Sequence, residues 1–312
     1  MRIGVDLGGT KIEVAALDAA GAFIDRRRIA TPPSYRGTID AICRLISATE
    51  TSLGERGTIG IGTPGSISPT TGLMRNANSV WLNDQALYAD LTAALGRPIR
   101  MANDANCLAL SEATDGAGAG FRTVFCVILG TGCGGGIVVD GRLLVGANGI
   151  AGEWGHAPLP WQSPSEFPGH ACWCGRRGCL ETYVSGPGLQ RDFAASSGRA
   201  DVDAAGVVAA ARAGDKIAID ALARYIDRLG RGLAMTCDVF DPDVIVLGGG
   251  MSNVTELYEQ LPSVIAHHVF ADACMTPVLP ARHGDSSGVR GAACLWSDAW
   301  GDAWSDARSD AQ

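Results

Sequence analysis

The 312-residue sequence predicts an α/β protein built from two related domains. Segments with the alternating pattern of strands are interspersed with segments of helical spacing, which is the order typical of α/β proteins. A pair of strands around a glycine turn opens the chain at 2–17, and the same pattern recurs at 123–140. We therefore expect domains at 1–117 and 118–286, with a helix near 287–298 that completes the first domain and a flexible tail at 299–312.

The elements of the first half follow from local patterns. Strands are expected at 2–7 and 11–17 because apolar residues alternate there, with Gly8-Gly9-Thr10 as the turn between them. Apolar residues at helical spacing then indicate a helix that includes Ile39–Ile46. The remaining expected elements are a strand at 58–62, a helix at 86–95, a strand at 98–102 and a helix at 105–113.

The second half repeats this order. A buried strand at 123–129 leads through a glycine-rich turn at 130–136 to a strand at 137–140. A long helix is expected at 216–239, followed by a strand at 244–247. The three glycines 248–250 then precede a helix that begins at about Ser252.

Composition restricts the classes of partner. A hydrophobic content of 46% with 19% charged residues is typical of a globular protein, and the net charge of -8 argues against nucleic acid or an anionic membrane surface. The N-terminus shows no signal-peptide pattern and no apolar run is long enough to span a bilayer, so we expect a cytoplasmic protein that binds a small molecule. Its ten cysteines are then reduced thiols or metal ligands.

The glycine turns indicate nucleotide binding, because glycine lets backbone N–H groups approach phosphate oxygens closely. The P-loop pattern is absent, since neither lysine of the chain follows a glycine. The stretches 60–65 and 130–135 match G-x-G-x-x-G, but neither leads into a helix as a dinucleotide-binding fold requires.

The two hairpin turns are therefore interpreted as phosphate-binding turns that face each other across a cleft between the domains. They comprise Gly8, Gly9, Thr10 and Lys11 in the first and Gly130, Thr131 and Gly132 in the second. Asp6, in the first hairpin, is expected to hold Mg²⁺ through water. The run Gly248, Gly249 and Gly250 is expected to face the adenosine and α-phosphate.

A cluster of thiols predicts a structural zinc site. Cys172, Cys174 and Cys179 are closely spaced and would supply three sulfur ligands, with His156 or His170 as the fourth ligand. Such a closed shell leaves no position for catalysis, so the expected role of zinc is to hold the segment 153–181.

Three carboxylates are candidates for chemistry on an alcohol. Asn103-Asp104 lies where a strand meets a helix, so Asp104 either caps the helix or reaches into a cleft. Phosphoryl transfer to a hydroxyl needs one carboxylate within hydrogen-bond reach of that hydroxyl, and Asp104 fits this role. Glu153 and Glu181, which flank the thiol cluster, are suited to bind pairs of sugar hydroxyls.

Together these motifs resemble the ROK family of bacterial sugar kinases and repressors. The resemblance rests on 6–11, 103–106, 130–132, 153–156, 172–181 and 241–250, and it covers the chain to about Trp296. The segments 63–69, 76–79 and 283–291 are most similar to the manno(fructo)kinase branch of that family.

The resemblance implies a ribonuclease-H-like, actin-type fold whose two domains close over ATP and a hexose. It implies that Asp104 is the general base and that His156, Cys172, Cys174 and Cys179 bind zinc, with His170 as a rival ligand. The sugar ligands that it implies are Gly65, Asn78, Asn103, Asp104, Glu153, His156 and Glu181. It also implies a homodimer.

The function expected from the sequence is ATP-dependent phosphorylation of the 6-hydroxyl of D-fructose, with mannose and glucose as further substrates. A glucokinase or mannokinase of the same family is the alternative. A sugar-responsive repressor and a sugar-independent actin-like ATPase are rival hypotheses. The repressor is disfavoured because the chain starts at the first strand with no helix-turn-helix pattern before it. The ATPase is distinguished by ATP turnover that needs no hexose.

Overall fold

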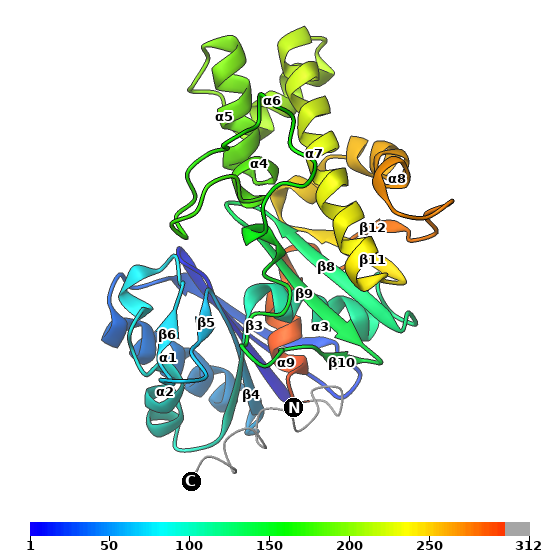
Figure 1. The fold of residues 1–312 in the computed structure, drawn as a ribbon. Coiled ribbons are helices and arrows are strands. Elements are labelled where there is room, and N and C mark those ends of the chain that lie inside the picture. The colour runs from blue at the N-terminus through cyan, green and yellow to red at the C-terminus, as the bar shows by residue number, and fades with distance from the viewer. Residues whose placement is uncertain (297–312) are drawn as a thin grey trace. The chain divides into compact units, whose positions relative to one another are not determined.

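The computed structural model describes residues 1–296, so the expected tail at 299–312 lies outside the described residues. The chain forms two compact units (Figure 1). The first comprises Met1–Arg122, Gly136–Ala151 and the described residues from His283 on, and the second comprises Thr123–Gly135 and Gly152–Arg282. The largest difference from the expected domains is at Gly136–Ala151, which belongs to the first unit, as do 118–122 and 283–286.

The first unit is built on a five-stranded sheet of order β3-β2-β1-β4-β7. The hairpin of β1 (Arg2–Leu7) and β2 (Lys11–Leu17) is antiparallel, and β3 (Phe23–Ala30) extends it as an edge strand. On the other side β4 (Thr58–Thr63) and β7 (Ile99–Asn103) run parallel to β1. The expected strands of this half are therefore confirmed, each within one residue.

Helices complete the first unit. They are α1 (Tyr35–Leu53), α2 (Leu87–Leu95), α3 (Asp104–Asp115) and α9 (Ser287–Cys294). The hairpin of β5 (Ser66–Ile67) and β6 (Met74–Arg75) and the 3-10 turn η1 (Val80–Leu82) lie between β4 and α2. α9 packs closely on β1 and β4 because Gly4 and Gly60 carry no side chain, and a Cβ on either would lie within 2 Å of an α9 carbonyl oxygen.

The second sheet repeats the first, with the order β10-β9-β8-β11-β12. Its strands are β8 (Thr123–Leu129), β9 (Cys133–Val139), β10 (Arg142–Leu143), β11 (Val244–Gly248) and β12 (Val278–Pro280). In both sheets three hairpin-connected strands are followed by two parallel ones. The expected duplication is therefore visible in the strand order.

The second unit carries a helical layer (Figure 1). α7 (Lys216–Phe240) is its longest helix and packs against α5 (Gly186–Ser197), α6 (Ala204–Arg212) and α8 (Glu256–His268). The short elements η2 (Trp154–His156), α4 (Glu181–Val184) and η3 (Gly250–Asn253) lie at the segments that carry the predicted motifs. The 3-10 turn η4 (Gly284–Ser286) leads into α9 in the first unit. Within residues 1–296, no helix is both long and apolar enough to cross a membrane.

Two expected elements need correction. The strand predicted at 137–140 is β9, which begins at Cys133, so its glycines belong to the strand. They are needed there, because a Cβ on Gly135 would lie 2.7 Å from the Gly152 carbonyl oxygen. The helix predicted from Ser252 is α8, which begins at Glu256 after the 3-10 turn η3.

Candidate active site

The β1–β2 hairpin places a half-buried carboxylate next to the first glycine turn. Asp6 lies directly opposite Glu13 in the hairpin register. Burial and, next in size, the charge of Asp104 raise the pKa of Asp6 to about 6, and the charge of Lys11 opposes this shift. The raised pKa means that the surroundings of this carboxylate disfavour its negative charge, and a cation bound nearby would stabilise that charge.

The second carboxylate of the hairpin is neutralised locally. Glu13 is buried, and its two oxygens accept hydrogen bonds from Arg26 Nε at 2.9 Å and Arg28 Nε at 3.0 Å. Burial acts to raise the pKa of Glu13, but these arginine hydrogen bonds lower it overall. Because like charges directly opposite each other destabilise a strand pair, the arginines from β3 make the Asp6–Glu13 pairing tolerable.

The turn itself is compact. Gly8 N–H donates to the Lys11 carbonyl oxygen at 2.9 Å. A Cβ on Gly9 would lie 3.3 Å from Ser79 Oγ and 3.9 Å from Asn78 Oδ1. Asn78, an expected sugar ligand, therefore lies beside the first glycine turn. The neighbouring Ser79 Oγ is buried and has no hydrogen-bond partner among the described residues.

The β7–α3 junction separates the cap of the helix from the candidate base. Asn103 is the N-cap of α3, and its Oδ1 accepts from Asn106 N–H at 2.7 Å. Asp104 is the first residue of the helix and is exposed, with its Oδ1 accepting from Ala105 N–H at 2.8 Å. Since Asn103 supplies the cap, the alternative that Asp104 serves as the cap is wrong.

A cavity of about 50 Å³ opens beside this junction, within the first unit. Gly65 and Asn103, both expected sugar ligands, line it, and so does Asn106, whose Oδ1 is buried with no hydrogen-bond partner in the described chain. The rest of its wall is mostly apolar and consists of Thr63, Ser66, Ile67, Met101, Ala102, Val145, Gly149 and Ala151.

The start of α9 lies against the half-buried carboxylate of Asp6. A Cβ on Gly288 would lie 3.2 Å from both Cγ and Oδ2 of Asp6, which is tighter than ordinary contact. Only glycine leaves Asp6 its present position. Sequence reasoning placed a helix here but gave Gly288 no role, because the contact joins residues at opposite ends of the chain.

In the second unit, a remote carboxylate reaches the second glycine turn. Gly130 N–H donates to the Gly132 carbonyl oxygen at 3.0 Å, which closes the turn. Glu181 Oε2 accepts from Cys133 N–H at 3.0 Å, immediately after the turn. A Cβ on Gly132 would lie 2.5 Å from that same oxygen, so glycine at this position lets Glu181 approach.

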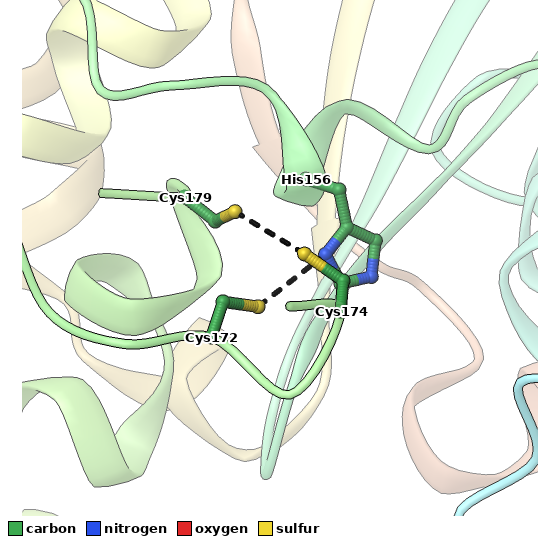
Figure 2. A group of neighbouring side chains, drawn as sticks. All are labelled: His156, Cys172, Cys174 and Cys179. Atoms are coloured by element: carbon green, nitrogen blue, oxygen red, sulfur yellow. Dashed lines mark hydrogen bonds between the residues drawn. The ribbon is translucent and has the colours of Figure 1, made fainter. Parts of the chain in front are cut away.

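The predicted metal ligands come together in the second unit (Figure 2). The ligand atoms of His156, Cys172, Cys174 and Cys179 all lie within 4.8 Å of one another. Cys174 Sγ is 3.6 Å from Cys179 Sγ, and His156 Nδ1 is 3.6 Å from Cys172 Sγ. His170 is outside this group, and its ring lies 5.2 Å from that of Tyr183.

The distances suit a tetrahedral zinc ion. Zn–S bonds of 2.3 Å and Zn–N bonds of about 2.05 Å give edges of about 3.8 Å between sulfurs and about 3.6 Å between sulfur and nitrogen. Burial acts to raise the pKa of Cys174, but hydrogen bonds from Arg176 N–H and the neighbouring thiols lower it to about 7. Burial raises the pKa of Cys172 and raises that of Cys179 to about 12, so binding of a metal ion by all three thiols would release protons from these two.

A buried ion-pair network holds the chain just before the thiols. Arg231 on α7 donates to the carbonyl oxygens of Pro160 and Trp161, both at 3.0 Å, and to Glu166 Oε1 at 2.8 Å. Arg228 donates to the same Glu166 oxygen at 2.8 Å. Burial acts to raise the pKa of Glu166, but the two arginines lower it to about 2.

The remaining predicted residues lie at element ends. Glu153 is half-buried and precedes η2, where the indole of Trp154 donates to the Gly134 carbonyl oxygen at 3.3 Å. Gly249 and Gly250 are exposed after β11. Gly249 has φ +81°, and a Cβ there would lie 2.5 Å from the Leu129 carbonyl oxygen, so the turn requires glycine.

The model of the ROK family matches residues 2–299 of this sequence. The chain belongs to the ROK family. It is 40% identical over 298 residues to the N-acetylgalactosamine kinase AgaK of Shewanella sp. (strain ANA-3), covering 95% of this chain and 96% of that protein. The N-acetyl-D-glucosamine kinase of Haemophilus influenzae (strain 86-028NP) is 37% identical over 302 residues, with 95% and 99% covered.

The structure also matches solved ROK kinases. The crystal structure of a ROK glucokinase from Streptomyces griseus, in complex with glucose and AMPPNP, superposes with a TM-score of 0.76 at 32% identity. The match covers 94% of this chain and 98% of that one. The predicted two-domain sugar-kinase fold is thereby confirmed, and the chain is an ATP-dependent sugar kinase of the ROK family.

Proposed function

We propose that this ROK kinase transfers the γ-phosphoryl group of ATP to the 6-hydroxyl of a hexose, with Asp104 as the general base. The observation that carries the proposal is the β7–α3 junction. Asn103 supplies the helix cap, so the Asp104 carboxylate is exposed at the helix start and close enough to Asp6 to raise the pKa of Asp6. Two interacting carboxylates suit a reaction that needs one to take a proton and one to attract a cation.

The proposed step is a direct displacement. Asp104 accepts the proton of the 6-hydroxyl while the hydroxyl oxygen bonds to the γ-phosphorus and the bond to the β-phosphate oxygen breaks, which releases ADP. Mg²⁺, held near Asp6 through water, would neutralise charge on the phosphates. The turn of Gly8, Gly9, Thr10 and Lys11 and the turn of Gly130, Thr131 and Gly132 are assigned to the phosphates, and Gly248, Gly249 and Gly250 to the adenosine end. The N–H groups of Gly8 and Gly130 close their own turns, so the other backbone N–H groups of the turns would contact the phosphates.

The sugar ligands are proposed by residue type and position. Gly65 and Asn103 line the cavity next to Asp104, which supports assigning them to hydroxyls near the acceptor. Asn78, Glu153, His156 and Glu181 are assigned to the remaining hydroxyls. Carboxylates accept and amides both donate and accept, so the set suits a polyhydroxylated ligand.

Zinc is proposed as a structural ion held by His156, Cys172, Cys174 and Cys179. The support is the fit between the measured edges of this group and a tetrahedron of zinc bonds. If His156 binds the metal through Nδ1, the atom nearest Cys172, its Nε2–H is left to donate to a sugar hydroxyl. The ion would then orient a sugar ligand without taking part in the transfer.

For the preferred hexose we propose D-fructose, with mannose and glucose as further substrates. The support is the similarity of 63–69, 76–79 and 283–291 to the manno(fructo)kinase branch. The relatives described above do not support fructose, because they are named for N-acetylhexosamines. N-acetylglucosamine or N-acetylgalactosamine is therefore the second candidate substrate.

The test is a panel of these hexoses, assayed by coupled ADP release with the zinc-containing protein. The proposal expects kcat/KM for fructose to exceed that for both N-acetylhexosamines. The opposite ranking would overturn the proposed preference for fructose but would leave the sugar-kinase activity standing. ATP hydrolysis that is unchanged by any hexose would overturn the kinase proposal in favour of a sugar-independent ATPase. Light scattering of the same preparation would test the proposed homodimer.

A further inference from the structure

The zinc-binding motif contains a large aromatic side chain that has no assigned role. Trp173 lies between two of the thiols, Cys172 and Cys174, and 62% of its surface is exposed. An indole this exposed contributes little to the core, because the stabilisation from apolar burial scales with the area removed from water. Packing therefore does not explain why a tryptophan lies at this position of the motif.

Both ends of the indole contact proposed sugar ligands. Trp173 Nε1–H donates to Glu181 Oε1 at 2.7 Å. Its ring lies 4.9 Å from the ring of His156, with the two planes at 84°, an edge-to-face arrangement. The indole thus joins the two side chains that the proposed function assigns to sugar hydroxyls in this segment.

The hydrogen bond completes the positioning of Glu181. Its other oxygen, Oε2, accepts from Cys133 N–H at 3.0 Å, so each carboxylate oxygen has one donor. An ionised carboxylate has about two acceptor positions per oxygen, so each oxygen keeps one for a ligand hydroxyl. Two donors from different segments fix the rotamer of a side chain that would otherwise sample several.

We propose that Trp173 is a positioning residue that holds Glu181, through its indole N–H, in the orientation that binds the hexose. The inference rests on the proposed role of Glu181 as a sugar ligand. The property that matters is the donor, since an aromatic ring without it could contact His156 but not hold the carboxylate. A freed Glu181 would have to be ordered by the sugar itself, which weakens binding.

The experiment compares two substitutions in the zinc-containing protein. Trp173→Phe keeps a ring and removes the N–H, whereas Trp173→Gln keeps an N–H donor and removes the ring. Trp161→Phe is the matched control, because Trp161 is 52% exposed and stacks on His268, away from the thiols. Sugar KM, ATP KM, kcat, equilibrium hexose affinity without ATP, and zinc content are measured for each, with fructose and N-acetylglucosamine as probes.

Trp173→Phe is expected to raise the sugar KM and the dissociation constant about tenfold, with kcat, ATP KM and zinc content within about twofold of wild type. Trp173→Gln is expected to fall between Trp173→Phe and wild type, and Trp161→Phe to match wild type. An unchanged sugar KM in Trp173→Phe overturns the proposal. A lower sugar affinity in Trp173→Gln than in Trp173→Phe also overturns the proposal, because the ring and not the N–H would then be responsible. Loss of zinc from Trp173→Phe overturns it as well, because the effect would then come from the metal.

Failure of the proposed function is distinguishable from failure of this inference. If the wild-type protein neither phosphorylates nor binds any hexose, the proposed function on which the inference rests is overturned. If the wild-type protein is active and Trp173→Phe has the same sugar affinity, only the proposed role of Trp173 is overturned.

Discussion

The two glycine hairpins have the same topology but bring carboxylates to their turns in different ways. In the β1–β2 hairpin the carboxylate belongs to the strand, since Asp6 lies in β1 itself. The corresponding β8–β9 hairpin has an apolar first strand, and its carboxylate comes from Glu181, which lies 48 residues beyond Cys133 in the chain. A duplicated fold therefore supplies the two turns, and different parts of the sequence supply their charges.

This difference indicates a division of roles. Asp6 is half-buried next to another acid, and both effects raise its pKa, so a bound cation would stabilise its charge. Glu181 instead has a hydrogen-bond donor on each oxygen, Cys133 N–H on Oε2 and Trp173 Nε1–H on Oε1. The carboxylate of the first hairpin is suited to attract a cation next to the proposed base, whereas the carboxylate at the second turn is suited to accept a hydrogen bond from a ligand hydroxyl.

The largest expected effect concerns the proposed base near the first hairpin. Asp104→Asn removes the proton acceptor and keeps the side-chain size, so kcat should fall about 10³-fold while sugar affinity changes little. Turnover is measured by coupled ADP release, and sugar affinity by calorimetry. Asp40→Asn, an exposed aspartate on α1, is the control and should keep full activity. A variant of Asp104 that retained most of its kcat would assign the base elsewhere.

A second prediction uses the pH dependence of the first hairpin. The pKa of Asp6 is raised from 3.8 to about 6, so folding favours its protonated form. The ionised Asp6 carboxylate therefore destabilises the folded state. This destabilisation is absent below pH 4, grows between pH 4 and 6 and is complete above pH 6. The difference corresponds to about 3 kcal/mol of unfolding free energy.

Asp6→Asn should accordingly be more stable than wild type at pH 7.5, by up to about 3 kcal/mol, with the difference vanishing near pH 4. Urea unfolding without added Mg²⁺ measures this difference, and no chelator is used, so that the proposed zinc ion is not removed. The same variant should lose kinase activity. A difference that stays constant with pH would show that the folded state does not shift the pKa of Asp6.

Removing the proposed zinc ion tests the segment that carries Glu181 to the second hairpin. Cys174→Ser should abolish stoichiometric zinc and weaken sugar affinity about tenfold, because the chain that carries Trp173 and Glu181 loses its anchor. Residues 160–166 should stay ordered, since Arg228 and Arg231 hold them independently. Zinc analysis and calorimetry measure the effect, with Cys43→Ser as control. Unchanged sugar affinity in a verified zinc-free protein would separate the metal from the sugar site.

The smallest expected effect is at the start of α9. In Gly288→Ala the new methyl group would displace the Asp6 carboxylate by a few tenths of an ångström. We expect kcat to fall about fivefold and the apparent Mg²⁺ affinity to weaken, with the fold retained. Ser286→Ala, two residues earlier, is the control. Kinetics over a range of Mg²⁺ concentrations measure both quantities, and wild-type values for Gly288→Ala would show that Asp6 tolerates the displacement.

Local patterns were sufficient for much of the fold. The alternation at 2–17 predicted the strands of the first hairpin, because side-chain alternation follows directly from strand geometry. The continuous apolar run at 123–129 predicted the buried first strand of the second hairpin. Asn103-Asp104 marked a helix start for a similarly local reason. The edge strand β3 was not predicted, because its three arginines disguise the alternation. They lie there because two of them neutralise Glu13 on the neighbouring strand.

The sequence by itself determined the two glycine turns, the helix start that carries Asp104 and the set of thiols, since each depends on residues close together in the chain. Only the tertiary structure decided that His156 joins the thiols while His170 lies against Tyr183. It also decided that Gly288 lies against Asp6 and that Glu181 reaches Cys133. These contacts depend on how distant segments pack, and a pattern of neighbouring residues carries no information about that packing.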